Sequence, residues 1–221
     1  MARALAELLD AVLPTTCICC GTLGPHICES CRSGFAVQNR AVTRAGLSGI
    51  AVLDLDPPVH QLLRAIKDQG RTAALSELAV PIADAIVDNY VRPKPALAES
   101  VLVAMPTTRL SLRHRGCDLN QMLLRRVARR TGLQSNRGLR FARQPADQRG
   151  LDQAARFENL SGTMVFHPPP RLAPIILVDD VLTTGSTLLE ADRAIREAGG
   201  EVAGFCVFAE TRLLQDAKKE K

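Results

Sequence analysis

The chain has 221 residues and a net charge of +5, with 46% hydrophobic and 23% charged residues. These proportions are typical of a globular protein with one sizeable domain and a small addition. No run approaches the roughly 20 apolar residues of a membrane helix. Glu7 and Asp10 interrupt the apolar N-terminal stretch, which argues against a secretory signal. We therefore expect a cytoplasmic protein that does not insert into a membrane.

Five of the seven cysteines lie between residues 17 and 31, where they form two CxxC pairs. A tight turn brings both thiolates of such a pair to one side, and four thiolates suit a tetrahedral structural zinc site. The expected Zn²⁺ ligands are Cys17, Cys20, Cys28 and Cys31. His26 is an alternative ligand, and Cys19 is left over; disulfides and a redox pair are weaker alternatives in a cytosolic chain. This zinc ribbon, residues 14–36, has too little core to fold without metal.

The rest of the chain, residues 45–213, alternates between apolar runs and helical patterns. Strands are predicted over 52–55, 101–104, 174–178 and 202–209, and helices over 1–12, 59–68, 73–90, 118–130 and 188–198. Residues 37–49 are predicted to be a linker, and residues 133–162 a long polar loop of the kind that covers active sites. Strands that alternate with helices predict a doubly wound α/β sheet.

The segment from Ile175 to Leu189 combines a buried strand, the acidic pair Asp179 and Asp180, a loop of small residues and a helix. In an open parallel sheet, ligands bind where strands end. Backbone N–H groups at a helix start attract phosphate, whereas two carboxylates suit ribose hydroxyls or a metal. The expected 5-phosphate contacts are Thr183, Thr184, Gly185, Ser186 and Thr187. The segment therefore predicts a ribose 5-phosphate site, and it lacks the P-loop pattern with its lysine.

A second strand end, Met105-Pro106-Thr107-Thr108, also carries hydroxyl groups. Two such strand ends on one sheet edge suit a substrate with two phosphate groups. Arginines cluster over 109–130 and again over 137–156, which indicates either a solvated surface or a site for a polyanion, pyrophosphate or nucleic acid. The shortage of aromatic residues weakens the interpretation as a single-strand binding surface, because bases lack stacking partners.

The segment 175–189 resembles the phosphoribosyl-pyrophosphate (PRPP) motif of type I phosphoribosyltransferases. In that family the acidic pair binds the ribose hydroxyls and the TTGST-like loop binds the 5-phosphate. The wider order resembles the ComF family of competence-associated phosphoribosyltransferase-like proteins over about residues 14–211. Its motifs are the four-cysteine ribbon, Ala65-Ile66-Lys67-Asp68-Gln69-Gly70, Arg113-His114-Arg115-Gly116, Asp147-Gln148-Arg149-Gly150-Leu151, Arg156-Phe157-Glu158-Asn159-Leu160 and the PRPP motif.

This resemblance implies a type I phosphoribosyltransferase fold and Mg²⁺ as the cofactor that accompanies PRPP. Asp179 and Asp180 would hold the ribose as the catalytic pair, and residues 143–160 would stand where type I enzymes have a mobile hood. The residues implied on the pyrophosphate side are Thr107, Thr108, Arg113, Arg115 and Lys67. The chain departs from the family at Ala104 and Met105, where the family has proline and valine, and at Cys117, where the family has an aromatic residue. We expect Cys117 to be a buried apolar replacement rather than a reactive thiol.

Two functions remain open from the sequence. The leading hypothesis is transfer of 5-phosphoribosyl from PRPP to an acceptor that the sequence does not reveal, with release of pyrophosphate. The alternative is a PRPP- or nucleotide-binding protein without turnover, in which the zinc ribbon and the arginines engage single-stranded DNA or a helicase partner. The ComF resemblance implies a role in DNA uptake.

Overall fold

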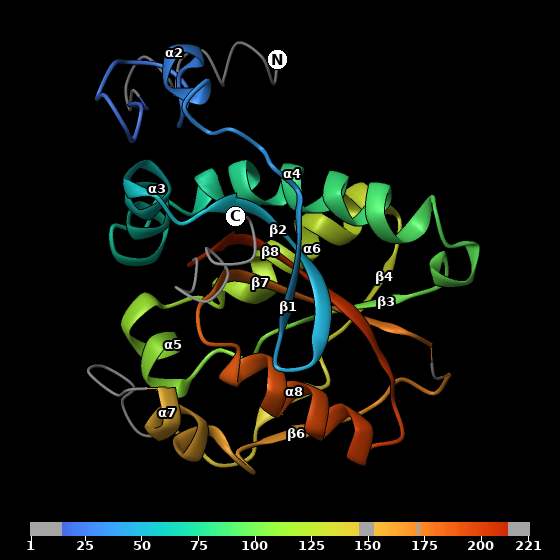
Figure 1. Ribbon diagram of the computed structural model, residues 1–221. Helices are drawn as coiled ribbons and strands as arrows, with labels where there is room; N and C mark the ends of the chain where they lie inside the picture. The colour runs from blue at the N-terminus through green and yellow to red at the C-terminus, as the bar shows by residue number, and fades with distance from the viewer. Residues whose placement is uncertain (1–14, 146–152, 172, 212–221) are drawn as a thin grey trace, which may run out of the picture.

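The computed structural model describes residues 15–145, 153–171 and 173–211 (Figure 1). One six-stranded sheet runs in the order β1-β2-β8-β7-β3-β4. Its strands are β1 (Arg40–Arg44), β2 (Leu47–Asp54), β8 (Val202–Glu210), β7 (Ile175–Leu182), β3 (Val101–Ala104) and β4 (Gln134–Asn136). Only β1 pairs antiparallel; the other neighbours are parallel. The predicted α/β class with a mostly parallel sheet is confirmed.

Both faces of the sheet are covered (Figure 1). On one face lie α3 (Pro57–Asp68), α4 (Leu75–Ile86) and α6 (Leu119–Thr131); on the other lie α8 (Ser186–Glu197) and the small sheet of β5 (Leu139–Phe141) and β6 (Met164–Phe166). Alternate residues of each central strand serve the two cores, because side chains of a strand point to opposite faces. Ile176 packs with the first group and Leu177 with the second. This is the doubly wound arrangement expected from the sequence.

The predicted linker over 37–49 is wrong, because β1 and the start of β2 form a hairpin there. The chain turns at Ala45 and Gly46, which adopt φ of 53° and 77°, and the strands pair from Arg40 opposite Ala51. The sequence of β1 does not show the usual apolar pattern of a strand, because one of its two buried residues is the arginine Arg44. The sheet therefore begins before the domain boundary predicted at residue 45.

The predicted structureless loop over 133–162 is also wrong in part, because β4, β5 and α7 (Gln153–Leu160) form within it. A short helix that was not predicted, α5 (Arg109–Arg115), follows β3; it begins at the cap Thr108 and ends at Gly116, whose φ is 69°. The predicted helix over 73–90 divides into a 3₁₀ turn, α4 and a π-helical turn over Val87–Val91, and Pro81 lies inside α4.

Two predictions concern residues that the structure does not describe. The predicted helix over 1–12 lies outside the described residues, as does the stretch 146–152 of the predicted hood. Within the described ranges, no helix combines the length and apolar character needed to cross a bilayer.

Cys206 is fully buried in the core, as predicted, and burial raises the pKa of its thiol. Cys117 is half-buried, packs against the core on the α3 side of the sheet and also lines a cleft.

Candidate functional site

The two predicted strand ends lie side by side. β3 and β7 are adjacent and parallel, and their last pair is Ala104 with Val178. β7 does not end there, contrary to the prediction, because β8 continues to pair with it as far as Leu182. Asp179 and Asp180 are therefore strand residues just past the end of β3. They lie at the carboxyl edge of the sheet, where ligands bind in open α/β folds.

The two carboxylates have different surroundings. The Nζ atom of Lys67, near the end of α3, lies 2.7 Å from Oδ2 of Asp180 and forms an ion pair with it. Asp179 accepts a hydrogen bond from the backbone N–H of Asp180 at 2.9 Å. Burial and the charge of Asp180 raise the pKa of Asp179 to about 7, against the opposing effect of Lys67. The raised pKa of Asp179 means that this carboxyl takes up a proton near neutral pH, and perturbed carboxyls of this kind are typical of functional sites.

Lys67 itself stays charged. Burial alone lowers the pKa of its ammonium group, but Asp180 and Asp179 outweigh burial and raise that pKa. The structure thus supplies a cation for an acidic pair that the sequence left uncompensated. In this ligand-free arrangement Lys67 contacts the ribose side of the predicted site, although the sequence placed it on the pyrophosphate side.

The loop after β7 has the shape that an anion site requires. Gly185 adopts φ of 86°, a left-handed conformation that favours glycine. A Cβ atom at this position would also lie only 3.1 Å from Cβ of Arg44, which is a tight contact. Gly185 precedes α8, whose first N–H groups receive no side-chain cap from it. Thr184 and Ser186 hydroxyls lie 3.0 Å apart. Thr183 is exposed and Thr187 partly exposed, whereas Ser186 is buried and its N–H donates to Oγ1 of Thr184 at 3.4 Å.

The predicted pyrophosphate residues lie in three separate places. The hydroxyls of Thr107 and Thr108 already make hydrogen bonds within the protein, since Thr107 donates to Oδ1 of Asp118 at 2.8 Å and Thr108 caps α5. Lys67 and Arg115 both line a cleft of about 220 Å³ between α3 and the end of α5. Arg113 is exposed on α5. The structure therefore brings two of the five predicted cations and hydroxyls to one cleft.

One part of the site was missed by sequence reasoning. Arg44 of β1 lies behind Gly185 and is only 7% exposed. Its guanidinium pairs at 3.3 Å with Glu210, whose side chain is fully buried, and Arg40 also contacts Glu210. The only signal in the sequence was the alternation of Val42 and Arg44, which lie on the same side of a strand. The linker prediction did not use it. This buried pair supports the loop from beneath.

The four predicted zinc ligands come together. One ligand atom from each of Cys17, Cys20, Cys28 and Cys31 lies within 4.8 Å of the others. A tetrahedral zinc site with Zn–S bonds near 2.3 Å spaces its sulfurs by roughly 3.8 Å, and Sγ of Cys20 and Cys28 are 3.6 Å apart. Cys19 and His26 stand outside this group. The cluster fits a structural metal such as zinc.

The four-cysteine ribbon is attached to the sheet domain. Gln61 of α3 donates to the carbonyl of Ile18 at 2.7 Å, and Arg71 donates to the carbonyl of Thr16. Arg32, beside the cluster, forms an ion pair of 2.7 Å with Glu77 of α4. Burial alone would raise the pKa of Cys17, but backbone N–H donors such as that of Cys28 lower it to about 6. A thiolate at neutral pH suits metal binding.

Comparison with known proteins points to the same segment. Residues 168–221 match the phosphoribosyl transferase domain family. The orotate phosphoribosyltransferase of Pyrobaculum calidifontis is 64% identical over 33 residues, which are 15% of this chain and 17% of that protein. The adenine phosphoribosyltransferase of Polynucleobacter asymbioticus is 40% identical over 50 residues, 23% of this chain and 29% of that protein. The chain thus matches less than a third of the length of these relatives.

Among solved structures, the match to an adenine phosphoribosyltransferase covers 71% of this chain and 79% of that protein's chain, with 15% identity and a TM-score of 0.42. The matched domain contains both acids and the loop that follows them. The part of the chain that contains the acidic pair and the loop is therefore similar to the phosphoribosyl transferase domain family, within a mostly parallel α/β sheet.

Proposed function

We propose that this protein is a ComF-type phosphoribosyltransferase that binds PRPP at the carboxyl edge of β7. The observation that carries the proposal is the sequence of features from Asp179 to Ser186: two half-buried acids, a left-handed glycine and the start of α8. The acids accept hydrogen bonds from the ribose hydroxyls, and the loop amides donate to the 5-phosphate.

In this proposal the pyrophosphate lies toward the cleft lined by Lys67 and Arg115. Ribose hydroxyls would take the place of Lys67 on Asp180, which would leave the ammonium group to face the pyrophosphate. Catalysis then depends on positioning and on stabilisation of the leaving group, and no covalent nucleophile is needed. Mg²⁺ prefers hard oxygen ligands such as the carboxylates of Asp179 and Asp180, and when bound with PRPP it would neutralise charge on the departing oxygens.

The remaining parts of the proposal follow from the ribbon and the relatives. Zn²⁺ held by the four cysteines stabilises the ribbon and takes no part in transfer, because a closed four-thiolate site has no open position. The acceptor is a nucleobase or related ring, of which adenine and orotate are the first to test, since they appear in the names of the matched transferases. A cytoplasmic location remains an expectation from the interrupted N-terminal stretch, and a role in DNA uptake remains an expectation of the ComF resemblance.

The test is pyrophosphate release from PRPP and Mg²⁺ in the presence of candidate bases. We expect release with wild type and none with Asp179→Asn combined with Asp180→Asn. Calorimetry should show that this double variant also binds PRPP at least ten-fold more weakly, since each lost charged hydrogen bond is worth about 1.5–3 kcal/mol. Asp84→Asn, at a side chain 52% exposed on α4, is the control. Unchanged PRPP affinity in the double variant would refute the ribose role.

A second candidate function, binding of single-stranded DNA without turnover, is supported by a basic groove. Arg125, Arg126 and Arg129 of α6 line an open cleft of about 600 Å³ beside Ser135 of the edge strand β4. A polyanion laid along it would release counterions, so its affinity would fall steeply with salt. Salt-dependent DNA binding without pyrophosphate release favours this function, and a helicase partner would then be sought. Release without DNA binding favours the enzyme.

A further inference from the structure

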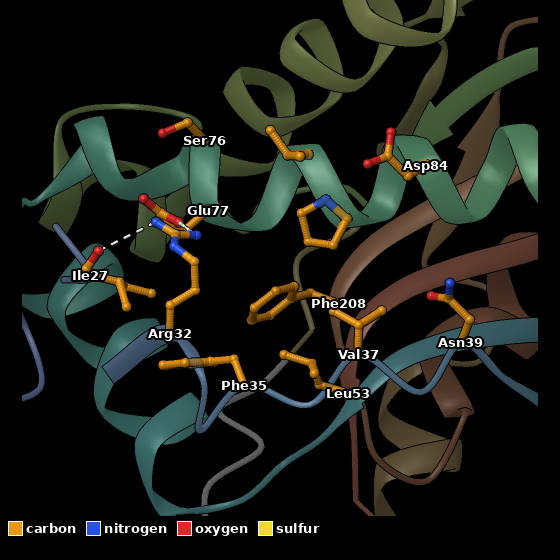
Figure 2. A pocket seen from close by; sticks show the side chains of 12 residues that line it. Ile27, Arg32, Phe35, Val37, Asn39, Leu53, Ser76, Glu77, Asp84 and Phe208 are labelled. Atoms are coloured by element: carbon orange, nitrogen blue, oxygen red, sulfur yellow. Dashed lines mark hydrogen bonds and ion pairs between the residues drawn. The ribbon is translucent and has the colours of Figure 1, made fainter. Parts of the chain in front are cut away.

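A preformed cavity lies between the four-cysteine ribbon and the sheet domain, away from the proposed PRPP site. Its volume is about 460 Å³, within the range of small-molecule pockets. One wall is the outer face of α4, which contributes Ser76, Glu77, Val80, Pro81 and Asp84. Figure 2 shows Phe35, Leu53 and Val37 along the opposite side, with Phe208 projecting between. None of the residues that line this cavity belongs to the predicted PRPP site.

The walls of the cavity are held by contacts that need no ligand. At one end Arg32 bridges Glu77 at 2.7 Å and the carbonyl of Ile27 at 3.3 Å (Figure 2). At the other end the N–H groups of Gln38 and Asn39 both donate to the carbonyl of Val52, at 2.9 and 3.3 Å. The cavity is therefore built into the fold rather than opened by a ligand.

The cavity is apolar at its mouth as well as inside. Val37 is 55% exposed and Val80 is 42% exposed, and both line it. Phe208, by contrast, is only 1% exposed and forms part of the floor. Exposed apolar side chains that gather around a hollow, rather than scattering singly, are typical of binding sites.

Asn39 supplies the polar feature that selects a ligand. Its Oδ1 atom is buried and has no hydrogen-bond partner among the described residues, an unfavourable state for an amide oxygen. Asn39 also adopts φ of 46°, a left-handed conformation that few residues other than glycine, asparagine and aspartate accept. The terminal torsion of asparagine is broad, so its amide can turn the oxygen toward a donor in the cavity.

We propose that this cavity binds a small, mostly apolar ring compound that carries one N–H or O–H donor. The ring lies between the α4 wall and the Phe35–Leu53 side, where it is removed from water. Its donor satisfies Oδ1 of Asn39. The acidic side chains at the rim do not require a cationic ligand, because Glu77 pairs with Arg32 and Asp84 with Arg130.

The experiment uses indole as the probe and indene as its isostere without the donor. The 221-residue chain contains no tryptophan, so the fluorescence of indole reports its own binding, and indene is measured by competition. We expect saturable indole binding, with indene about 2- to 10-fold weaker, the range for one hydrogen bond. Indole binding no stronger than that of indene, or no saturable binding at all, would overturn the proposal.

Variants at two positions make the test specific. Asn39→Gly keeps the left-handed backbone and removes the acceptor, so it should weaken indole to the level of indene. Asn39→Asp keeps an acceptor oxygen and should retain the preference for indole. Val80→Phe places a ring at the mouth from an exposed helical position, adds no indole fluorescence, and should abolish binding of both probes. If Asn39→Gly left the preference unchanged in a folded protein, the assigned ligand class would be wrong.

Discussion

Replacing Asp179 by asparagine should make the ligand-free protein more stable at alkaline pH. The pKa of Asp179 is raised from 3.8 to about 7, and each unit corresponds to 1.36 kcal/mol. Ionised Asp179 therefore destabilises the folded state by about 4 kcal/mol, or about 2 to 4 kcal/mol once its partial exposure is allowed for. Asparagine retains an acceptor oxygen for the N–H of Asp180 and carries no charge.

The sign of the pH dependence follows from proton binding. Between pH 4 and 7 the folded protein holds the Asp179 proton more tightly than the unfolded chain does, so wild-type stability falls as pH rises through this window. Asp179→Asn lacks this fall. Urea unfolding between pH 5 and 8 should show the two proteins diverging, with the variant about 2 to 4 kcal/mol more stable at pH 8. Parallel curves for the two proteins would show that Asp179 is not perturbed.

Three further predictions concern the same edge of the sheet. Lys67→Gln removes the ion pair with Asp180 and should weaken pyrophosphate binding about ten-fold in calorimetry, as expected for one charged hydrogen bond. Gly185→Ala should lower the free energy of unfolding by about 1–2 kcal/mol, because alanine resists a left-handed φ, and should weaken phosphate binding. Arg44→Met leaves the carboxylate of Glu210 buried with fewer partners and should lower the free energy of unfolding by about 3–5 kcal/mol in urea unfolding.

Each of these variants has a matched control. Arg64→Gln changes an exposed cation on the same helix as Lys67 and should leave pyrophosphate affinity unchanged. Gly199→Ala meets the same left-handed strain, at φ of 79°, in open space; it should lose stability without losing phosphate binding. Adding Glu210→Gln to Arg44→Met should recover part of the lost stability. Equal effects of the paired glycine variants on phosphate would contradict the role given to the loop.

Local patterns were enough for much of the molecule. The apolar run at 175–178 and its small-residue loop predicted a strand, a turn and a helix, because those elements depend on neighbouring residues. The two CxxC pairs predicted a cluster whose geometry the structure confirms. Errors arose where a local pattern was incomplete, as at the end of β7, whose last four residues are strand because β8 pairs with them.

What the sequence by itself determined was therefore the class of the fold and the four cysteines that cluster in the ribbon. Only the tertiary structure decided that Lys67 pairs with Asp180, that Arg44 reaches Glu210 beneath the loop, and that a cavity forms between ribbon and sheet. Periodicity and spacing report contacts within a turn or a strand. Contacts between residues more than a hundred positions apart depend on how whole elements pack, and no local pattern records them.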